Sequence, residues 1–394
     1  MRTARATLRR PATTAALTAA GLLFSAGCSS DGGGEPAAGS TRSSESARES
    51  PDGAKPSAAD VPPDKGTVKV ARTVAEGLKS PWGLAPLPGG DLLVSSRDDG
   101  TLTRVDGESG EKTEVGSVPG VAPEGEGGLL GIALSPDFAS DRLVYAYFTT
   151  ASDNRIARLL YDEKKPERRQ LGAPDTVFKG IPKGFTHNGG RIAFGPDKQL
   201  YAGTGESGDP ELSQDRRSLG GKILRMTPTG EPARDNPEPD SVVYSWGHRN
   251  VQGIAWDGGK RLWAAEFGQD TYDEVNLIKA GENYGWPEVE GEGDDADFVN
   301  PVAQWTTDEA SPSGVAVTAG SVWMAGLRGE RLWRVPLDGE RRSADPQAFL
   351  EGEFGRLRTV HEAGEGKLWL VTSNTDGRGD ARGGDDRILL LNVT

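Results

Sequence analysis

The sequence predicts an all-β protein built as a six-bladed β-propeller, preceded by an N-terminal signal and a disordered tether. Glycine accounts for 55 of the 394 residues, about twice its usual share of roughly 7 %, and this favours a turn-rich β fold. Beyond residue 65, a pair of short strand-like segments occurs six times. Successive pairs start about 46 to 62 residues apart, the range of periods in which propeller blades are expected.

The first 27 residues read as an export signal. Four arginines lie within the first ten residues, ahead of a mostly apolar run over residues 15–26 that is too short to span a bilayer. The small residues Ala26 and Gly27 precede Cys28, the only cysteine, and this resembles a bacterial lipobox. We therefore expect cleavage before Cys28, lipidation of its thiol and attachment to the outer face of the cell membrane. An ordinary secretory signal with an incidental cysteine is the alternative.

Residues 28–65 are rich in Ser, Gly, Ala, Pro and charged residues and contain almost no large apolar residue. This composition predicts a flexible tether. The chain carries a formal net charge of −14, and loss of the signal with its four arginines would make it more acidic. Such a charge repels phosphate backbones and argues against nucleic acid as a partner.

Residues 66–394 are predicted to form the propeller. The six predicted strand pairs are 91–96 with 101–105, 142–148 with 155–160, 199–204 with 222–226, 261–266 with 273–278, 321–325 with 331–335, and 367–372 with 387–391. One hairpin cannot bury both of its faces, whereas six blades closed in a ring stack face to face and leave only short edges. A β-sandwich is the alternative architecture, but it would be unusually long for its class.

His187 is the main candidate for chemistry, because it lies in a glycine-rich loop, F-T-H-N-G-G-R, just before a strand-like run. The glycines allow a ligand to approach the backbone closely. A histidine satisfied within a turn is the alternative, and that interpretation is kept for His248 and His361. No dinucleotide fingerprint, phosphate-binding loop or serine-hydrolase elbow is present, which argues against those classes.

Two groups of arginines suggest an anionic ligand. Arg249 and Asn250 follow a glycine and precede an apolar strand, a compact set of donors for planar oxygens. Arg356 and Arg358 alternate with a leucine and therefore share one face of a strand. Their charges repel unless an anion lies between them, and a polycarboxylate ligand, solvent or Glu353 are the alternatives for it.

Acidic residues cluster in three places. Asp270, Asp273 and Glu274 follow Gly268 and offer hard oxygen ligands of the kind that Ca²⁺ prefers, although their spacing is not that of the helical calcium loop. The acidic runs at 294–297 and 376–386 are interpreted as solvated loops.

From about residue 81 to residue 393 the chain resembles the soluble, pyrroloquinoline quinone (PQQ) dependent aldose dehydrogenases, grouped as glucose/sorbosone dehydrogenases. The motifs that carry the resemblance are P-W-G-L at 81–84, G-L-L-G-I-A-L-S-P-D-F at 128–138, H-N-G-G-R-I-A-F-G-P-D at 187–197, G-K-I-L-R at 221–225, G-H-R-N-V-Q-G at 247–253, D-E-V-N-L-I at 273–278, N-Y-G-W-P at 283–287 and G-R-L-R at 355–358. Members of that family are six-bladed propellers.

The resemblance implies oxidation of the anomeric hydroxyl of an aldose to the lactone, with hydride transfer to PQQ and Ca²⁺ as second cofactor. It does not imply a particular sugar or electron acceptor. The roles that it implies are general base for His187, quinone contacts for Arg249 and Asn250, PQQ carboxylate contacts for Arg356 and Arg358, calcium ligation by the carbonyls of Gly268 and Gln269 near Asp273, and a border of the sugar site for Trp305.

Three positions depart from the family pattern. Arg328 stands where lysine is frequent, and Thr186 replaces an acidic or amide residue. Glu126 replaces a glutamine near the cofactor, and its charge would repel PQQ unless a cation neutralises it. Two other functions stay open: a calcium-dependent lactonase using Glu126, Asn188, Asn250 and Asp273, and a cofactor-free binding lipoprotein.

Overall fold

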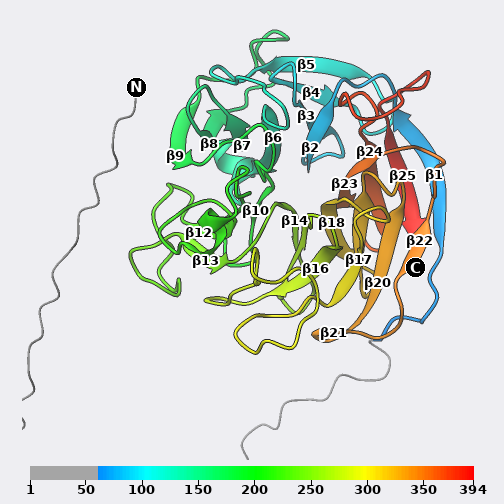
Figure 1. The fold of residues 1–394 in the computed structure, drawn as a ribbon. Coiled ribbons are helices and arrows are strands. Elements are labelled where there is room, and N and C mark those ends of the chain that lie inside the picture. The colour runs from blue at the N-terminus through cyan, green and yellow to red at the C-terminus, as the bar shows by residue number, and fades with distance from the viewer. Residues whose placement is uncertain (1–60) are drawn as a thin grey trace, which may run out of the picture. The chain divides into compact units, whose positions relative to one another are not determined.

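The computed structural model describes residues 61–394, which form a ring of six β-sheets around a central channel (Figure 1). The predicted signal over 1–27, Cys28 and nearly all of the predicted tether lie outside the described residues. Within residues 61–394, no helix has the length and apolar character needed to cross a membrane.

Each blade is an antiparallel sheet whose first strand faces the channel. Blade one consists of β2 (Pro81–Pro86), β3 (Leu92–Ser96), β4 (Thr101–Val105) and β5 (Lys112–Ser117). Blade two consists of β6 (Leu129–Leu134), β7 (Leu143–Thr149), β8 (Asn154–Leu160) and β9 (Asp175–Ile181). Blade three consists of β10 (Ile192–Phe194), β11 (Leu200–Gly203), β12 (Lys222–Met226) and β13 (Val243–Trp246). Two single-turn helices, α1 (Phe138–Asp141) and α2 (Glu211–Gln214), lie in loops of blades two and three.

The fourth and fifth blades continue this order. They consist of β14 (Val251–Trp256), β15 (Leu262–Glu266), β16 (Tyr272–Ile278) and β17 (Ala303–Thr306), followed by β18 (Pro312–Thr318), β19 (Ser321–Gly326), β20 (Leu332–Asp338), β21 (Arg341–Arg342) and β22 (Gln347–Phe349). In blade five, both β21 and β22 pair with β20.

The sixth blade joins the two ends of the described chain. Its strands β23 (Leu357–Glu362), β24 (Lys367–Thr372) and β25 (Ile388–Val393) are completed by β1 (Val68–Ala75), which pairs antiparallel with β25. In Figure 1 the blue strand β1 therefore lies beside the red strand β25. Because blade six needs strands from both ends, the ring cannot open without breaking a strand pair.

The apolar core lies between the blades. Six clusters of buried side chains occur within residues 61–394, and each joins at least two neighbouring blades. Between blades one and two, for example, Leu93 and Leu102 pack with Val144 and Leu159, and all four have no exposed surface. Complete burial of one such side chain is worth about 1.5–3 kcal/mol, so the stacking of blades stabilises the ring.

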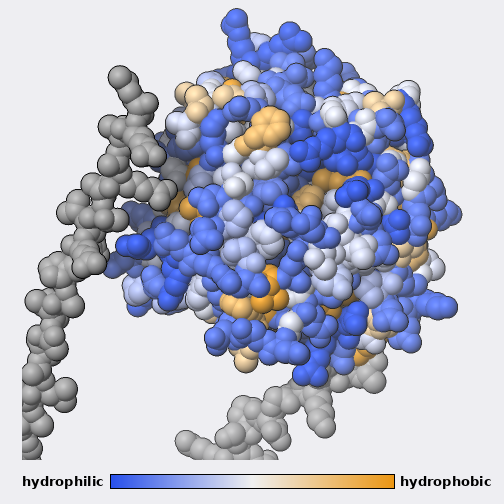
Figure 2. Space-filling model, in the orientation of Figure 1, coloured by the Kyte–Doolittle hydropathy of each residue, from blue (hydrophilic) through white to orange (hydrophobic). Residues whose placement is uncertain are grey.

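All six predicted strand pairs are confirmed, and they are the second and third strands of the blades. These strands are covered on both faces, which gives them the clearest apolar pattern. The β-sandwich alternative is wrong. The face shown in Figure 2 is mostly hydrophilic with separate small apolar spots, and Phe185, 69 % exposed, is the most exposed large apolar side chain of the described residues.

The prediction for the acidic run at 376–386 is wrong at its two ends. Residues 376–386 were expected to form a solvated loop, yet Asp376 and Asp386 are buried. Asp386 accepts hydrogen bonds from the Thr372 hydroxyl at 2.8 Å and the Thr375 amide at 3.0 Å. Its carboxylate therefore ties the loop after β24 to the end of that strand, and buried carboxylates with this many donors are structural elements.

Candidate functional site

A cavity of about 380 Å³ opens at one end of the channel and is lined by residues from all six blades. The lining residues lie near the start of a first strand or after a second strand. In an antiparallel blade these two positions are at the same end of the sheet, so the ring gathers six pairs of loops around one opening. The polar loops that contain Glu126, His187 and Arg249 are among those that supply lining residues.

The cavity is cationic although the chain as a whole is acidic. Six of its lining residues are arginines, against two carboxylates, Glu126 and Asp376. The arginines are Arg97, Arg249, Arg328, Arg356, Arg358 and Arg378. An excess of guanidinium groups in one concave site is suited to a ligand with several carboxylates.

His187 is held by a buried carboxylate that the sequence analysis did not identify. Its Nδ1 lies 2.7 Å from Oε1 of Glu206, whose side chain is only 2 % exposed, while His187 itself is 18 % exposed. A carboxylate at this position accepts a hydrogen bond from the N–H at Nδ1. The neutral ring therefore has its free lone pair on Nε2. Because His187 also lines the cavity, it is arranged as a proton acceptor.

The backbone of the histidine loop is fixed in a left-handed conformation. His187 has φ of 55°, and its amide donates to Oε2 of Glu126 at 2.8 Å. The following Gly189 has φ of 59°, and its amide donates to Oδ1 of Asn250 at 2.9 Å. A side chain at Gly189 would meet the Gly203 carbonyl at 2.5 Å, so glycine is required for this close approach.

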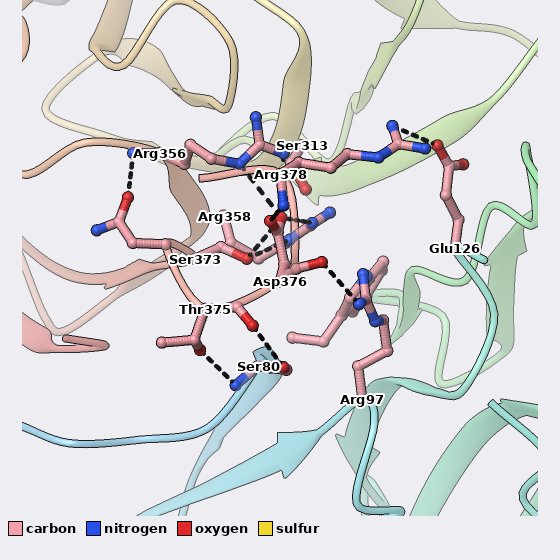
Figure 3. A network of polar contacts seen from close by, with 12 residues as sticks. Ser80, Arg97, Glu126, Ser313, Arg356, Arg358, Ser373, Thr375, Asp376 and Arg378 are labelled. Atoms are coloured by element: carbon pink, nitrogen blue, oxygen red, sulfur yellow. Dashed lines mark hydrogen bonds and ion pairs between the residues drawn. The ribbon is translucent and has the colours of Figure 1, made fainter. Parts of the chain in front are cut away.

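Arg356 and Arg358 share a buried counterion, Asp376 (Figure 3). One amino group of each arginine lies 3.0 and 3.1 Å from Oδ2 of Asp376, respectively. Burial alone would raise the pKa of the Asp376 carboxyl, but the charges of Arg358 and Arg356 outweigh it and hold the pKa below its ordinary value. In the structure, an anion between these arginines is the side chain of Asp376, a residue that was not among the expected ones.

Trp82, which is 2 % exposed, also lines the cavity. The Arg191 guanidinium lies 4.3 Å from the centre of the Trp82 ring, and Arg358 lies 5.8 Å from it. Burial lowers the pKa of Arg191 to about 9 and that of Arg358 to about 10. Since Gln252 and Thr359 also bond these arginines, the first strands of several blades are locked together under the cavity.

Arg249 reaches the predicted calcium ligands. Its guanidinium donates to the Gly268 carbonyl at 2.6 Å, and its backbone amide donates to Glu266 at 3.0 Å. The guanidinium also lies 5.4 Å from the centre of the Trp286 ring. Burial lowers the pKa of Arg249. The structure thus brings a cation and the Gly268 carbonyl together at the cavity wall.

The loop after β15 is held by two acidic side chains. One oxygen of Glu290 accepts four consecutive backbone amides, from Gln269 to Tyr272, at 2.7 to 3.1 Å. Asp273 accepts from the amides of Gly268 and Ser311 at 2.9 and 2.6 Å, and burial raises its pKa to about 7. Both Asp273 oxygens thus bond backbone donors, and Asp273 does not line the cavity.

Two further predicted residues lie apart from the centre of the site. Arg328 lines the cavity, but its side chain is 63 % exposed and pairs with Asp308 at 2.7 Å. Trp305 does not border the cavity. It is 5 % exposed on β17 and packs 5.2 Å from Trp333 in the core between blades four and five. Side chains alternate between the two faces of a strand, and Trp305 lies on the face of β17 that packs against this core. The motifs alone did not indicate this face.

The four residues of the lactonase alternative are not brought together. Glu126 and Asn250 line the cavity, whereas the Asn188 side chain bonds Asn154 and Gly184 inside the protein. No group of three or more His, Cys, Asp or Glu side chains suited to a metal occurs in residues 61–394. Those side chains therefore do not assemble a carboxylate-bound metal centre.

Sequence reasoning missed Trp82, Arg97, Glu206, Asp376 and Arg378. Trp82 lay in a motif already noted, P-W-G-L, and Glu206 lies in a polar segment just after a predicted strand. Asp376 and Arg378 lay in a run interpreted as solvated. Glu206 and Asp376 meet their partners across neighbouring loops of one blade, whereas Arg378 pairs with Glu126 of another blade. These contacts appear only once the blades are folded and packed.

His248 has the structural role that was expected. It is fully buried, stacks on Tyr284 with ring centres 4.6 Å apart, and bonds Ser245 and Glu266 at 2.8 and 3.2 Å. The Asn276 amide donates to both Glu266 and Glu274 at 2.9 Å. Burial, with the nearby charge of Glu266, raises the pKa of Glu274 to about 8.

The Glu274 carboxyl is expected to make stability depend on pH. Its folded pKa exceeds its unfolded value, so the folded state binds the extra proton, and stability falls as pH rises from about 4.3 to about 8. Glu274→Gln should flatten this decline in unfolding measurements between pH 5 and 8, and the exposed Glu292→Gln should keep it. If the free energy of unfolding declines equally with pH in the wild type, Glu274→Gln and Glu292→Gln, then Glu274 does not hold the extra proton.

A family model described as Glucose / Sorbosone dehydrogenase matches residues 78–389. An aldose sugar dehydrogenase from Streptomyces coelicolor, solved in its PQQ-bound form, is 76 % identical, with a TM-score of 0.84 over 84 % of this chain and 100 % of that chain. The aldose sugar dehydrogenase YliI of Escherichia coli is 29 % identical over 79 % of this chain and 91 % of its own. Quinoprotein glucose dehydrogenase B of Acinetobacter calcoaceticus is 30 % identical over 63 % of this chain and 59 % of its own.

The propeller and its cationic cavity with a carboxylate-oriented histidine define an oxidoreductase of the sugar dehydrogenase class. The chain belongs to the glucose/sorbosone dehydrogenase family, as its motifs predicted.

Proposed function

We propose that the protein oxidises the anomeric hydroxyl of an aldose to the lactone, with PQQ bound in the cavity. The observation that carries this proposal is the pairing of His187 with Glu206 at the wall of a cavity lined by six arginines. The family match and the PQQ in the Streptomyces coelicolor structure support it.

The residues present fit a flat polycarboxylate such as PQQ. The cavity of about 380 Å³ is lined in part by the buried aromatic residue Trp82. Arg356 and Arg358 would hold carboxylates, and Arg249 and Asn250 would contact the quinone. Burial strengthens each of these charge-assisted contacts because water competes less for the guanidinium groups.

Bound PQQ would supply a hydride acceptor. The Nε2 of His187 would remove the proton of the anomeric hydroxyl while hydride leaves the same carbon. Glu206 keeps the proton of the neutral ring on Nδ1 and stabilises the ring after it has gained a second proton, as carboxylates do for catalytic histidines. The product is the lactone, since the carbon loses a hydride and its hydroxyl loses a proton.

Calcium belongs to this proposal through the carbonyls of Gly268 and Gln269. The Gly268 oxygen accepts a hydrogen bond from Arg249, so metal binding there would require the guanidinium to change partner. Hard carbonyl oxygens suit Ca²⁺, and Asp273 would act indirectly by fixing the loop through the Gly268 amide.

Titration with PQQ and Ca²⁺ tests the function. Purified protein should bind PQQ, reduce a dye with aldoses as donors, and lose activity with a calcium chelator. Hydrolysis of lactones without PQQ would favour the lactonase. Ligand binding that survives Arg356→Glu would favour a cofactor-free binding protein. Absence of both PQQ binding and turnover would refute the proposal.

We also propose that Cys28 anchors the enzyme to the outer face of the membrane. The basic start, the short apolar run and the small residues before Cys28 support this. Cys28→Ser should move the protein from the membrane fraction to the soluble extracytoplasmic fraction and abolish labelling by a fatty acid. Unchanged fractionation would contradict the anchor.

A further inference from the structure

Glu126 and Arg378 both line the cavity and form an ion pair with each other (Figure 3). Nη1 of Arg378 lies 2.8 Å from Oε1 of Glu126. Arg378 comes from the loop after β24 in blade six, and Glu126 from the loop before β6 in blade two. Blade one lies between these blades in the ring, so the pair spans a whole blade.

Both members of the pair are anchored at their other end. Oε2 of Glu126 accepts from the His187 amide at 2.8 Å, and the Glu126 amide donates to Phe185 at 2.9 Å. The Arg378 amide donates to Oδ1 of Asp376 at 2.9 Å. The pair therefore connects the histidine loop with the arginine cluster.

The two carboxylates that line the cavity are neutralised to different degrees. Asp376 is 2 % exposed and contacts both Arg356 and Arg358. Glu126 is 19 % exposed, and within residues 61–394 its one ion pair is with Arg378, which is 54 % exposed. Without Arg378, the negative charge of Glu126 would face a cavity otherwise suited to a polyanion. That charge would repel the carboxylates of the ligand, because like charges within one site repel.

We propose that Arg378 is a specificity-determining residue of this site. It cancels the charge of Glu126, so that the pair admits a polycarboxylate that Glu126 alone would repel. Glu126 meanwhile keeps its second oxygen on the amide of the catalytic histidine. This inference rests on the proposed function, because it takes PQQ as the polycarboxylate. It predicts that Arg378 matters for binding only while residue 126 is charged.

A double-mutant cycle tests this dependence. The dissociation constant for PQQ would be measured by spectroscopic titration of the wild type, Arg378→Gln, Glu126→Gln and the double variant. Arg378→Gln should weaken binding about tenfold, within the usual range of coupling between contacting residues. In the Glu126→Gln background the same change should cost less than about threefold, since no carboxylate remains to be neutralised.

Matched measurements separate this effect from unfolding and from general charge loss. Arg382→Gln removes an exposed arginine of the same loop and should bind PQQ like the wild type. Melting temperatures of the unliganded proteins should stay close together, because Arg378 is half exposed. The difference in PQQ affinity between Arg378→Gln and the wild type should become smaller at about 1 M salt, because charges are then screened within roughly 3 Å.

The outcomes are distinguishable. If the wild type binds no PQQ, the proposed function fails and this inference fails with it. If the wild type binds PQQ but the loss of Arg378 has the same effect in both backgrounds, or no effect, then this inference alone is overturned.

Discussion

Replacement of His187 by alanine is expected to lower kcat for aldose oxidation by about 10²–10⁴-fold, the usual contribution of a general base. Nε2 is the proton acceptor in the proposed reaction, and no other histidine lines the cavity within the described residues. PQQ binding should change little, because the six arginines remain. Steady-state kinetics with a PQQ titration on the same sample would measure both quantities.

Glu206→Gln gives a sharper version of this test. Oε2 of Glu206 accepts the Gly208 amide, while Oε1 faces Nδ1 of His187. In the variant, the Gly208 amide would hold the single carbonyl oxygen and leave the NH₂ group facing Nδ1. The proton would then move to Nε2, where the ring cannot act as a base.

The expected result for Glu206→Gln is a kcat loss comparable to that of His187→Ala, with normal PQQ affinity. The double variant should lose little more than either single one, because the two residues act as a unit. Additive losses, or a Glu206→Gln enzyme with wild-type kcat, would mean that the hydrogen bond does not set the tautomer.

Asp376→Ala is expected to lower the free energy of unfolding by about 3–5 kcal/mol, as removal of one partner from a buried ion pair does. Arg356 and Arg358, 11 % and 6 % exposed, would lose the carboxylate between them. Saturating PQQ should restore part of this stability, since its carboxylates would supply the missing anion. Chemical unfolding with and without PQQ would measure both effects.

Acidification offers an independent check on Asp376. Because its pKa lies below the ordinary value, its stabilising contribution is present above the unfolded pKa of about 3.9 and is lost as pH falls. The variant should therefore lose less stability on acidification than the wild type does. Asp380→Ala, at an exposed position of the same loop, should change stability by less than about 0.5 kcal/mol. Equal stabilities of the two variants would contradict the role assigned to Asp376.

The sequence by itself determined the ring. The middle strands of each blade are buried on both faces, so their apolar pattern and spacing stand out in the linear chain. It also proposed His187, Arg249, Arg356 and Arg358 as site residues, because glycines and ordered motifs surround them, and all four line the cavity. The outer strands and the closing strand β1 did not stand out, since exposed strands carry mixed polar residues.

Only the tertiary structure decided the partners of the histidine and the arginines. Glu206 is the hydrogen-bond partner of His187, and Asp376 is the anion between Arg356 and Arg358. Trp305, which was expected to border the sugar site, packs in the core. The physical reason is that an ion pair or hydrogen bond depends on distance in space. Glu126 and Arg378 are far apart in the chain, and their charges meet only where the closed ring brings blades two and six to one cavity.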